Sequence, residues 1–215
     1  MDANRFAPYE SLALTLLRSY PSVDDGAHDF SHIERVWRNI KVIHAHEGGD
    51  LEILAASVLL HDCVQAPKNS PLRESASRLA AAEARNRLKE LQWEKTRIQA
   101  VAHAIESHSF SAGIAPLTLE AKILQDADRL DAIGFTGIAR CFYTAGRMGS
   151  SLYHPADPRG NARPLDDRQF ALDHFPKKLL KLADGFQTSA GRSLAQKRQQ
   201  ALQAFYDGIL AEIDS

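Results

Sequence analysis

Residues 51–63 read LEILAASVLLHDC, a run of aliphatic and small side chains that ends on an imidazole and a carboxylate. A helix with so little polar surface is expected to be buried on most of its sides. Placing His61 and Asp62 at its end is costly unless other groups pair with them. Alone, the two residues also fit a core histidine and an aspartate that bonds backbone groups at a helix end.

The preceding segment supplies a second imidazole. Residues 31–47 carry an apolar side chain every three or four positions and are followed by two glycines, which predicts an amphipathic helix with Ser31 as its N-cap. His32 falls in the first turn of this helix, beside apolar neighbours. We therefore expect it to face partly inward, the alternative being a solvated surface histidine.

A third candidate lies in residues 123–133, which read ILQDADRLDAI. This pattern predicts a helix that carries Asp126, Asp128 and Asp131 among buried aliphatic side chains. Buried carboxylates need a metal, an arginine or several hydrogen-bond donors. Arg129 can form an ion pair with one of these carboxylates. The alternative to a metal site is therefore a network of Asp–Arg ion pairs that joins helices.

The rest of the chain is also helical in pattern, and we find neither a strand signal nor an internal repeat. Residues 146–164, which contain three glycines and three prolines around Tyr153 and His154, are expected to form a loop and are a candidate lid. The sequence predicts an all-α helical bundle. Its further helices are expected at about 9–20, 73–91, 93–107, 138–145, 170–186 and 194–213.

His32, His61, Asp62 and Asp128 together offer two neutral nitrogens and two anionic oxygens. This set suits an octahedral divalent ion with two positions left for water and substrate. Mn²⁺ is favoured, with Mg²⁺, Co²⁺, Ni²⁺ and Fe²⁺ as alternatives, while Zn²⁺ usually prefers four tetrahedral ligands. Such an ion would polarise a phosphoryl oxygen and lower the pKa of a bound water.

The order His…His-Asp…Asp on separate helices resembles the HD superfamily of metal-dependent phosphohydrolases. The context Ala127-Asp128-Arg129-Leu130 is similar to that of the family's last ligand, which selects Asp128 over Asp126 and Asp131. The phrases at 28–32, 105–111, 125–134 and 174–188 resemble one bacterial branch, so the resemblance covers nearly the whole chain.

The resemblance implies one domain over residues 1–215, with a metal-site core at about 28–134 and C-terminal helices at about 165–215 packing on it. The similar branch includes enzymes that cleave nucleoside triphosphates to monophosphate and pyrophosphate, which makes a nucleotide the expected substrate. Other readings stay open: a nucleoside monophosphatase, a phosphodiesterase, a non-catalytic nucleotide sensor and a helical scaffold.

Several residues are expected to assist the reaction. His103 and His108 lie where two-metal relatives carry additional ligands, so they are candidates for a second ion or for substrate phosphates, or for neither. The candidate catalytic residues are Asp62, His28, Asp29 and Asp131. The candidate substrate-binding residues are Lys68, Arg73, Ser77, His103, His108 and Arg129.

Bulk composition limits the partners. The net charge of −1 over 215 residues gives no support for binding a nucleic-acid polymer or a membrane surface. The two cysteines stand far apart, and the N-terminal apolar stretch at 12–17 is too short for a signal peptide. We expect a cytoplasmic protein, and a homodimer is left open.

Overall fold

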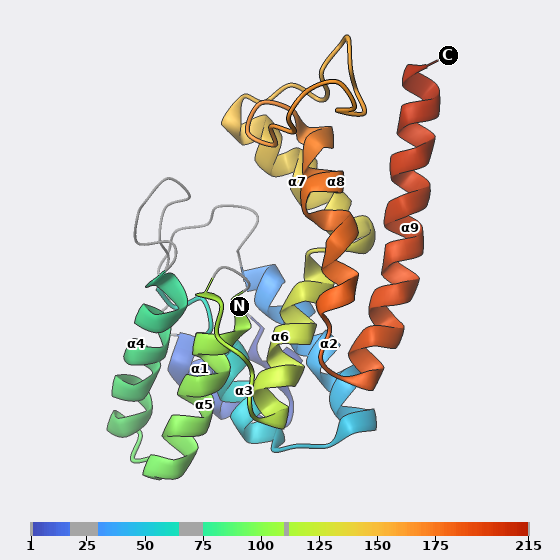
Figure 1. Cartoon of the computed structure of the whole chain (residues 1–215). Coiled ribbons are helices and arrows are strands. Elements are labelled where there is room, and N and C mark those ends of the chain that lie inside the picture. The colour runs from blue at the N-terminus through green and yellow to red at the C-terminus, as the bar shows by residue number, and fades with distance from the viewer. Residues whose placement is uncertain (1, 18–29, 65–74, 110–111, 215) are drawn as a thin grey trace. The chain divides into compact units, whose positions relative to one another are not determined.

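The structure is a computed structural model that describes residues 2–17, 30–64, 75–109 and 112–214. Within these ranges the secondary structure is helical, and the β pairing is limited to an isolated bridge between Ser151 and Phe170 (Figure 1). The predicted all-α fold is therefore confirmed. No helix in these ranges has both the length and the apolar composition needed to cross a bilayer.

The chain divides into two compact units. Unit 1 comprises Met1–Asp128 and Gln187–Ala190, and unit 2 comprises Arg129–Phe186 and Gly191–Ser215. A single domain over the whole chain stays a prediction. The helices are η1 (Ala3–Phe6), α1 (Glu10–Leu17), α2 (Phe30–Glu47), α3 (Leu51–Leu60), α4 (Ala76–Glu90), α5 (Lys95–His108), α6 (Leu119–Asp131), α7 (Gly134–Met148), η4 (Ala171–Asp173), α8 (His174–Lys177), η5 (Leu179–Gly185) and α9 (Ser189–Ile213).

The amphipathic pattern of α2 produces the expected buried face. The buried apolar residues are Ile33, Val36, Trp37, Ile40 and Ile43. The helix already begins at Phe30, so the prediction of Ser31 as its N-cap is wrong. It ends where Gly48 adopts a φ of 77° and donates its N–H to the His44 carbonyl, a left-handed termination that favours glycine.

Helix α3 is the centre of unit 1. Every residue from Ile53 to Leu60 is buried, as its aliphatic sequence predicts. Asp50 caps its N-terminus by accepting hydrogen bonds from the N–H groups of Glu52 and Ile53. The helix ends at Leu60, with His61 as C-cap, so the first metal candidates lie at the end of the most buried helix.

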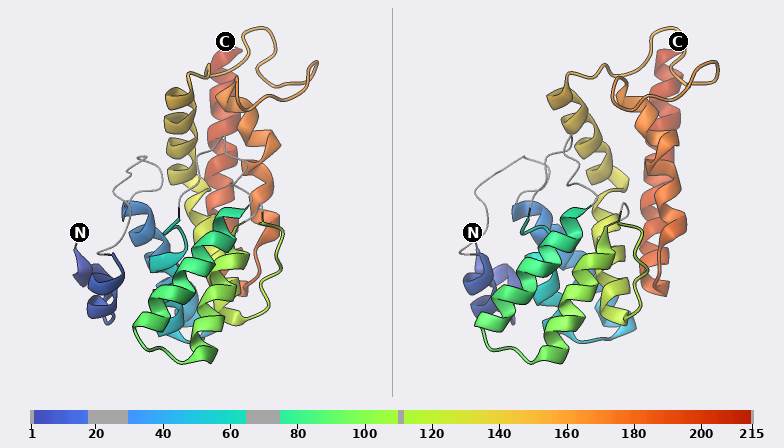
Figure 2. Two further views of the ribbon diagram at one scale, coloured as in Figure 1. Left: turned by 90° about the vertical axis from the view of Figure 1, so that its left-hand side faces the viewer. Right: turned by 60° about the vertical axis from the view of Figure 1, so that its left-hand side comes forward.

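Helices α4 and α5 form an antiparallel hairpin, seen side by side in both views of Figure 2. Their contact is built from small side chains, because Ala80, Ala81 and Ala84 of α4 are fully buried, as are Ala102 and Ala104 of α5. Small residues allow the two helix axes to approach closely. The hairpin therefore holds the ends of α4 and α5 in a fixed register.

The helices of unit 1 alternate in direction, and this brings the candidate residues to one end. Figure 1 shows the N-terminal ends of α2 and α4 at the same end of unit 1 as the C-terminal ends of α3 and α5. His32 belongs to the first of these ends, His61 follows α3, and His108 is the last residue of α5. Residues far apart in sequence can therefore converge.

In unit 2 the prediction of one continuous helix at about 170–186 is wrong. Three short pieces, η4, α8 and η5, occupy this segment. The backbone leaves helical geometry at Lys178, where φ is −137° and ψ is −60°. Pro176 has no N–H for a helical hydrogen bond, so it fits only the first turn of α8, where it lies.

Phe175 of α8 packs against the rings of Phe142 and Phe205, with ring centroids 6.0 and 5.7 Å apart.

The loop predicted at 146–164 is present, although α7 extends to Met148 before it begins. An arginine fastens it to the core of unit 2. Arg163 donates from both terminal nitrogens to the Asp173 carboxylate at 2.6 and 2.7 Å, and its guanidinium lies 4.8 Å from the centre of the Phe170 ring. Asp173 is 1% exposed, so this charge pair is largely shielded from water.

Candidate metal centre

The four predicted ligands come from three segments of unit 1, and three of them surround the imidazole of the fourth, His32. The donor atoms of His32, His61 and Asp128 lie within 4.8 Å of one another. His32 Nε2 is 3.2 Å from His61 Nε2 and 3.4 Å from Asp128 Oδ1. Asp62 Oδ2 lies 3.5 Å from His61 Nε2 and 3.8 Å from His32 Nε2. The structure thus brings together the set that the sequence selected.

His61 is held in one tautomer by the helix that carries it. Its Nδ1 lies 2.8 Å from the Val58 carbonyl oxygen, which can only accept, so Nδ1 bears the proton. Nε2 therefore presents its lone pair to the cluster. Burial, and then the charges of His108 and His32, lower the pKa of His61 against the opposing effect of Asp62. A neutral imidazole is the form that binds a metal.

The carboxylates are ionised and partly open to solvent. Burial opposes ionisation of Asp128, but the hydrogen bond and charge of His32 and the charge of His108 outweigh it, so its pKa falls well below the usual range. The pKa of Asp62 is likewise lowered, because the neighbouring imidazoles outweigh its burial. The two side chains are 27% and 26% exposed, whereas the imidazoles of His32 and His61 are at most 2% exposed. The oxygens thus face the side that a substrate can reach.

These groups fit a divalent cation. Ligands about 2.1 Å from an ion and at right angles to each other stand roughly 3 Å apart. The measured separations of 3.2–3.8 Å are close to that value. Carboxylate oxygens and imidazole lone pairs at such distances repel each other unless a cation or a proton lies between them.

His108 adds a third imidazole. It is 7% exposed, and its Nδ1 lies 2.6 Å from the Ile105 carbonyl, so its Nε2 also presents a lone pair. That nitrogen is 3.9 Å from Asp62 Oδ1, and the rings of His108 and His61 meet edge to face at 5.1 Å. His61, Asp62 and His108 form a second group able to hold a cation.

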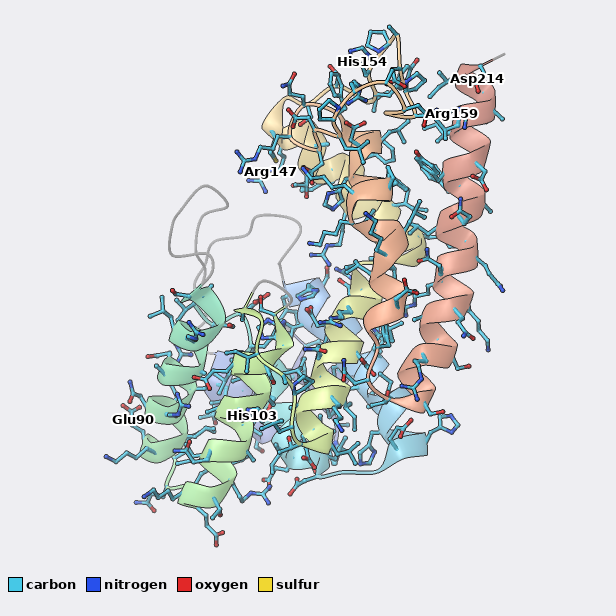
Figure 3. The ribbon with its side chains drawn as sticks, viewed as in Figure 1. Glu90, His103, Arg147, His154, Arg159 and Asp214 are labelled. Atoms are coloured by element: carbon cyan, nitrogen blue, oxygen red, sulfur yellow. The ribbon has the colours of Figure 1, made fainter. Side chains whose placement is uncertain are left out.

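The other predicted residues have different surroundings. His103, labelled in Figure 3, accepts a hydrogen bond at 2.9 Å from the Leu117 N–H. Ser77 is buried in the first turn of α4. In unit 2, Asp131 accepts from Arg140 at 2.9 Å, and Arg129 donates to the Gly185 carbonyl at 2.6 Å. Neither metal-binding group found among the described residues includes these four residues. His28, Asp29, Lys68 and Arg73 lie outside the described residues.

Asp126, the competitor of Asp128, has a structural partner. Its carboxylate accepts hydrogen bonds from the Gln187 N–H at 2.8 Å and from the N–H and hydroxyl of Thr188, both at 2.7 Å. The residue is completely buried, so these bonds offset the cost of burying its charge. This anchors the segment that enters α9.

One residue that supports the site did not emerge from the sequence. Asn39 is 8% exposed and donates its side-chain N–H to the Ala127 carbonyl at 2.9 Å, next to Asp128. The signal was available, because Asn39 follows His32 by seven positions and so shares its helix face. An amide on an otherwise apolar face indicates a specific partner.

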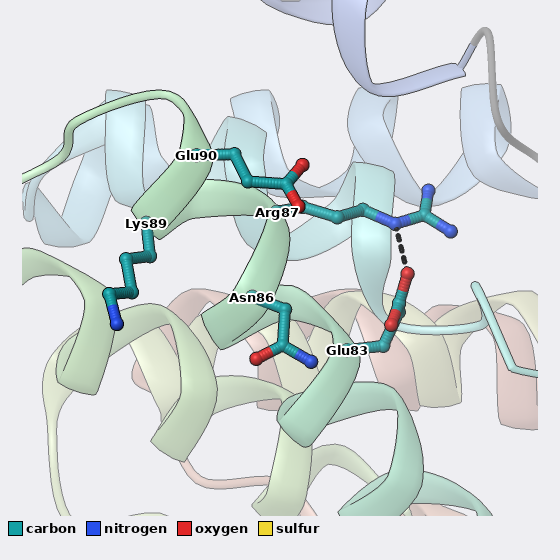
Figure 4. Close-up of a pocket in the computed structure, with 5 residues that line it drawn as sticks. All are labelled: Glu83, Asn86, Arg87, Lys89 and Glu90. Carbon is teal, nitrogen blue, oxygen red and sulfur yellow. Dashed lines mark hydrogen bonds and ion pairs between the residues drawn. The ribbon is translucent and has the colours of Figure 1, made fainter.

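A surface pocket on α4 does not compete with this centre. Glu83, Asn86, Arg87, Lys89 and Glu90 line it, all from the C-terminal half of that helix (Figure 4). Arg87 donates to Glu83 at 2.7 Å, so the pocket's charges partly neutralise each other. None of its residues belongs to the groups of potential metal ligands found in the described chain.

Comparison with known proteins shows which family the chain belongs to. The HD domain family matches residues 29–133. The curated protein YpgQ of Bacillus subtilis, itself described as uncharacterized, is 34% identical over 195 residues, which cover 89% of this chain and 87% of YpgQ.

Two solved structures are similar over nearly the whole chain. A crystal structure of YpgQ in complex with ADP superposes with a TM-score of 0.69 at 31% identity, covering 99% of this chain and 98% of that one. An HD-superfamily hydrolase of Bacillus thuringiensis gives a TM-score of 0.72 at 28% identity with the same coverage. The chain therefore belongs to the HD superfamily of hydrolases.

Proposed function

We propose that this protein is a metal-dependent phosphohydrolase that cleaves nucleoside triphosphates to monophosphates and pyrophosphate. The observation that carries the proposal is the donor set of two buried imidazoles and two partly exposed carboxylates, in which donor atoms of His61, Asp128 and Asp62 lie 3.2–3.8 Å from His32 Nε2. Buried histidines on one side and open oxygens on the other suit an ion that must also meet a substrate.

His32, His61, Asp62 and Asp128 would hold the ion, with Mn²⁺ as the favoured metal. When bound, a divalent ion supplies a Lewis acid for a phosphoryl oxygen and lowers the pKa of water. The Val58 and Ile105 carbonyls fix the orientation of His61 and His108. A fixed ring needs no reorganisation during the reaction.

The nucleotide class rests on a relative. YpgQ has been crystallised with ADP, and its chain aligns with this one from end to end. A diphosphate nucleotide offers the charged oxygens that a metal site of this kind attracts. Lys68 and Arg73 stay our predicted phosphate contacts, and His28 and Asp29 our predicted proton-transfer residues.

Whether the site binds one metal ion or two depends on the role of His108. We keep it as a substrate-binding residue or as a ligand of a second ion that shares the Asp62 carboxylate with the first. Metal analysis of the purified protein at saturating Mn²⁺ distinguishes the two, since a second ion gives two equivalents for the wild type and one for H108A.

The reaction is tested by product analysis. Metal-stripped protein is incubated with dATP, GTP and a nucleoside monophosphate, Mn²⁺, Mg²⁺ or Co²⁺ is restored, and the products are separated by ion exchange. We expect metal-dependent release of pyrophosphate and a monophosphate. Orthophosphate from the monophosphate would make the protein a phosphatase, and ligand binding without turnover would make it a sensor.

Substitution of the ligands tests the site. H61A, D62A and D128A should each lose bound metal and turnover while circular dichroism still shows a folded helical protein. D184A, at an exposed aspartate of η5, is the matched control and should keep both properties. Wild-type turnover by metal-free D128A would refute the assignment.

The remaining expectations concern context. We propose a cytoplasmic enzyme that acts on free nucleotides rather than on nucleic acids or membranes, in line with the net charge of −1. Light scattering on the purified protein distinguishes a monomer from the homodimer left open by the sequence.

A further inference from the structure

Gln125 of α6 is a buried residue whose side-chain amide makes a single hydrogen bond in the described chain. The residue is 3% exposed, and its Nε2 donates to the Ser107 carbonyl at 2.6 Å. Only an N–H can face a carbonyl oxygen at this distance, so the amide has one orientation. Its buried Oε1 is left without a partner among the described residues, which lowers stability. The hydrogen bond to Ser107 is therefore what distinguishes this amide from a cheaper apolar side chain.

The accepting carbonyl lies at the end of the helix that carries His108. Helix α5 ends at His108, and the carbonyls in the last turn of a helix have no donor within it. One of these carbonyls, that of Ile105, accepts from His108 Nδ1 at 2.6 Å, and the Ser107 carbonyl accepts from Gln125. The His108 ring is thus held by its own helix, and the end of that helix is held by α6.

The donor side of this link belongs to the metal centre. Gln125 precedes Asp128 by three positions, so the two side chains leave α6 on the same face. The Ser107 hydroxyl donates to the His103 carbonyl at 2.8 Å, within its own helix, and so makes no link to α6. The hydrogen bond from Gln125 therefore joins the segment that carries Asp128 to the residue before His108.

His108 depends on such a link because its Nε2 must meet one particular carboxylate oxygen. The lone pair of Nε2 lies 3.9 Å from Asp62 Oδ1, while Oδ2 of the same carboxylate lies 3.5 Å from His61 Nε2. The carboxylate can therefore bridge two ions, with Oδ1 and His108 on the second ion. Metal–ligand distances hold to within about 0.2 Å, so a small shift at the end of α5 would separate these two ligands.

We propose that Gln125 is a positioning residue, whose amide holds the end of α5 against α6 so that His108 Nε2 and Asp62 Oδ1 bind a second divalent cation. The inference rests on the proposed function, in its form with two ions, and adds the residue that aligns the second pair of ligands. Gln125 acts through His108, so its effect on metal binding should vanish when His108 is removed.

The test is equilibrium dialysis against Mn²⁺, with elemental analysis of the number and affinity of bound ions. Q125M replaces the amide with an apolar side chain of similar length. Q199M is the matched control, because Gln199 of unit 2 donates from Nε2 to the Leu180 carbonyl at 2.9 Å and also has a buried Oε1 without a partner. We expect Q125M to bind the second Mn²⁺ about tenfold more weakly, as is usual when a residue that orients a metal ligand is lost, and Q199M to match wild type.

Combining Q125M with H108A separates positioning from a general loss of structure. H108A should bind one Mn²⁺, and adding Q125M should leave the affinity for that ion unchanged. A general loss of structure would instead weaken binding in both backgrounds. Melting followed by circular dichroism checks that each variant is folded, and Q125L repeats the comparison if Q125M unfolds at the assay temperature.

Four outcomes would overturn the role of Gln125: a wild type that binds fewer than two Mn²⁺, unchanged second-ion binding by Q125M, an equal loss in Q199M, or a loss that persists in the H108A background. Nucleotide hydrolysis is measured on the same preparations. Hydrolysis by wild type without a Q125M defect in metal binding leaves the proposed function standing and removes the role of Gln125. A selective Q125M defect in a protein that hydrolyses no nucleotide keeps that role and removes the reaction.

Discussion

Three aspartates within two turns of α6 show how one residue type takes three roles. Asp126 accepts hydrogen bonds from Gln187 and Thr188, Asp128 lies among the imidazoles of the metal centre, and Asp131 pairs with Arg140 within unit 2. Successive helix positions turn by about 100°, so side chains two, three and five positions apart face different neighbours. Each carboxylate therefore interacts with a different partner.

Substituting the first two aspartates should separate stability from metal binding. D126N keeps one acceptor oxygen but loses charged hydrogen bonds, so the free energy of unfolding should fall by about 2 kcal/mol while bound Mn²⁺ is unchanged. D128N should lower bound Mn²⁺ at least about tenfold. Thermal melting and elemental analysis measure the two effects, and loss of metal in D126N with a normal D128N would reverse the assignment.

Cys63 is a residue whose chemistry is set by burial. Desolvation is the main reason that its pKa is raised to about 12. At pH 8 only about one thiol in ten thousand is then ionised, and the thiolate is the reactive form. Iodoacetamide should therefore leave Cys63 unmodified in native protein and modify it after unfolding, as peptide mass spectrometry can show. Rapid labelling of Cys63 in folded protein would contradict its burial.

At the scale of elements, apolar periodicity predicted most helices because burial and sequence pattern coincide in them. Helices α2 and α3 follow their apolar residues closely. The same reasoning failed at 170–186, where apolar spacing continues while the backbone breaks at Lys178. Periodicity reports which face is buried, and short 3-10 pieces bury a face as well as an α-helix does.

The metal centre was likewise predicted from the sequence only in part. Residue type and helix position predicted that His32, His61, Asp62 and Asp128 could meet. Each is a polar residue next to apolar residues that the sequence pattern places in the core. The support by Asn39 and the burial of His108 depend on which helices pack side by side, and a single sequence does not give the packing partners.

The Arg163–Asp173 pair tests whether the loop after α7 is a fixed element. R163A removes two charged hydrogen bonds from the buried Asp173 carboxylate, which keeps only the Asp166 N–H, so we expect a clear loss in the free energy of unfolding. R159A is the matched control, since Arg159 pairs with Asp214 on the surface (Figure 3), and it should cost at most about 1 kcal/mol. Equal stability of R163A and R159A in urea denaturation would show that the pair does not hold the loop.

The same pair predicts a pH dependence. Burial alone would raise the pKa of Asp173, but the hydrogen bonds from Arg163 outweigh it, so the folded pKa lies below the ordinary value of 3.8. A group with a lowered folded pKa contributes its stability above the unfolded value and loses it as the pH falls through the folded value. Wild type should therefore lose stability below about pH 4, and D173N should lose less over that window, as urea denaturation at several pH values can measure. An identical acid dependence in D173N would exclude Asp173 as a source.

For the molecule as a whole, the metal centre links stability to function. Its donors come from α2, the end of α3 and α6, so a cation between them joins segments that are distant in the chain. Without a cation, the carboxylates of Asp62 and Asp128 and the Nε2 atom of His61 each stand within 4 Å of His32 Nε2. Metal binding should therefore stabilise the fold as well as prepare the site.

Removing the metal measures this linkage. A ligand that binds only the folded state at about 100 times its Kd adds about 2.7 kcal/mol to the free energy of unfolding. For a chain of this size that corresponds to a rise of roughly 5–10 °C in Tm. We expect this rise when Mn²⁺ is added to EDTA-treated wild type and its loss when EDTA is restored. D128N should show little rise, because its weakened site fills poorly at the same Mn²⁺ concentration. An equal rise in D128N would place the stabilising ion elsewhere, and no rise in wild type would mean that the cluster is folded and satisfied by protons alone.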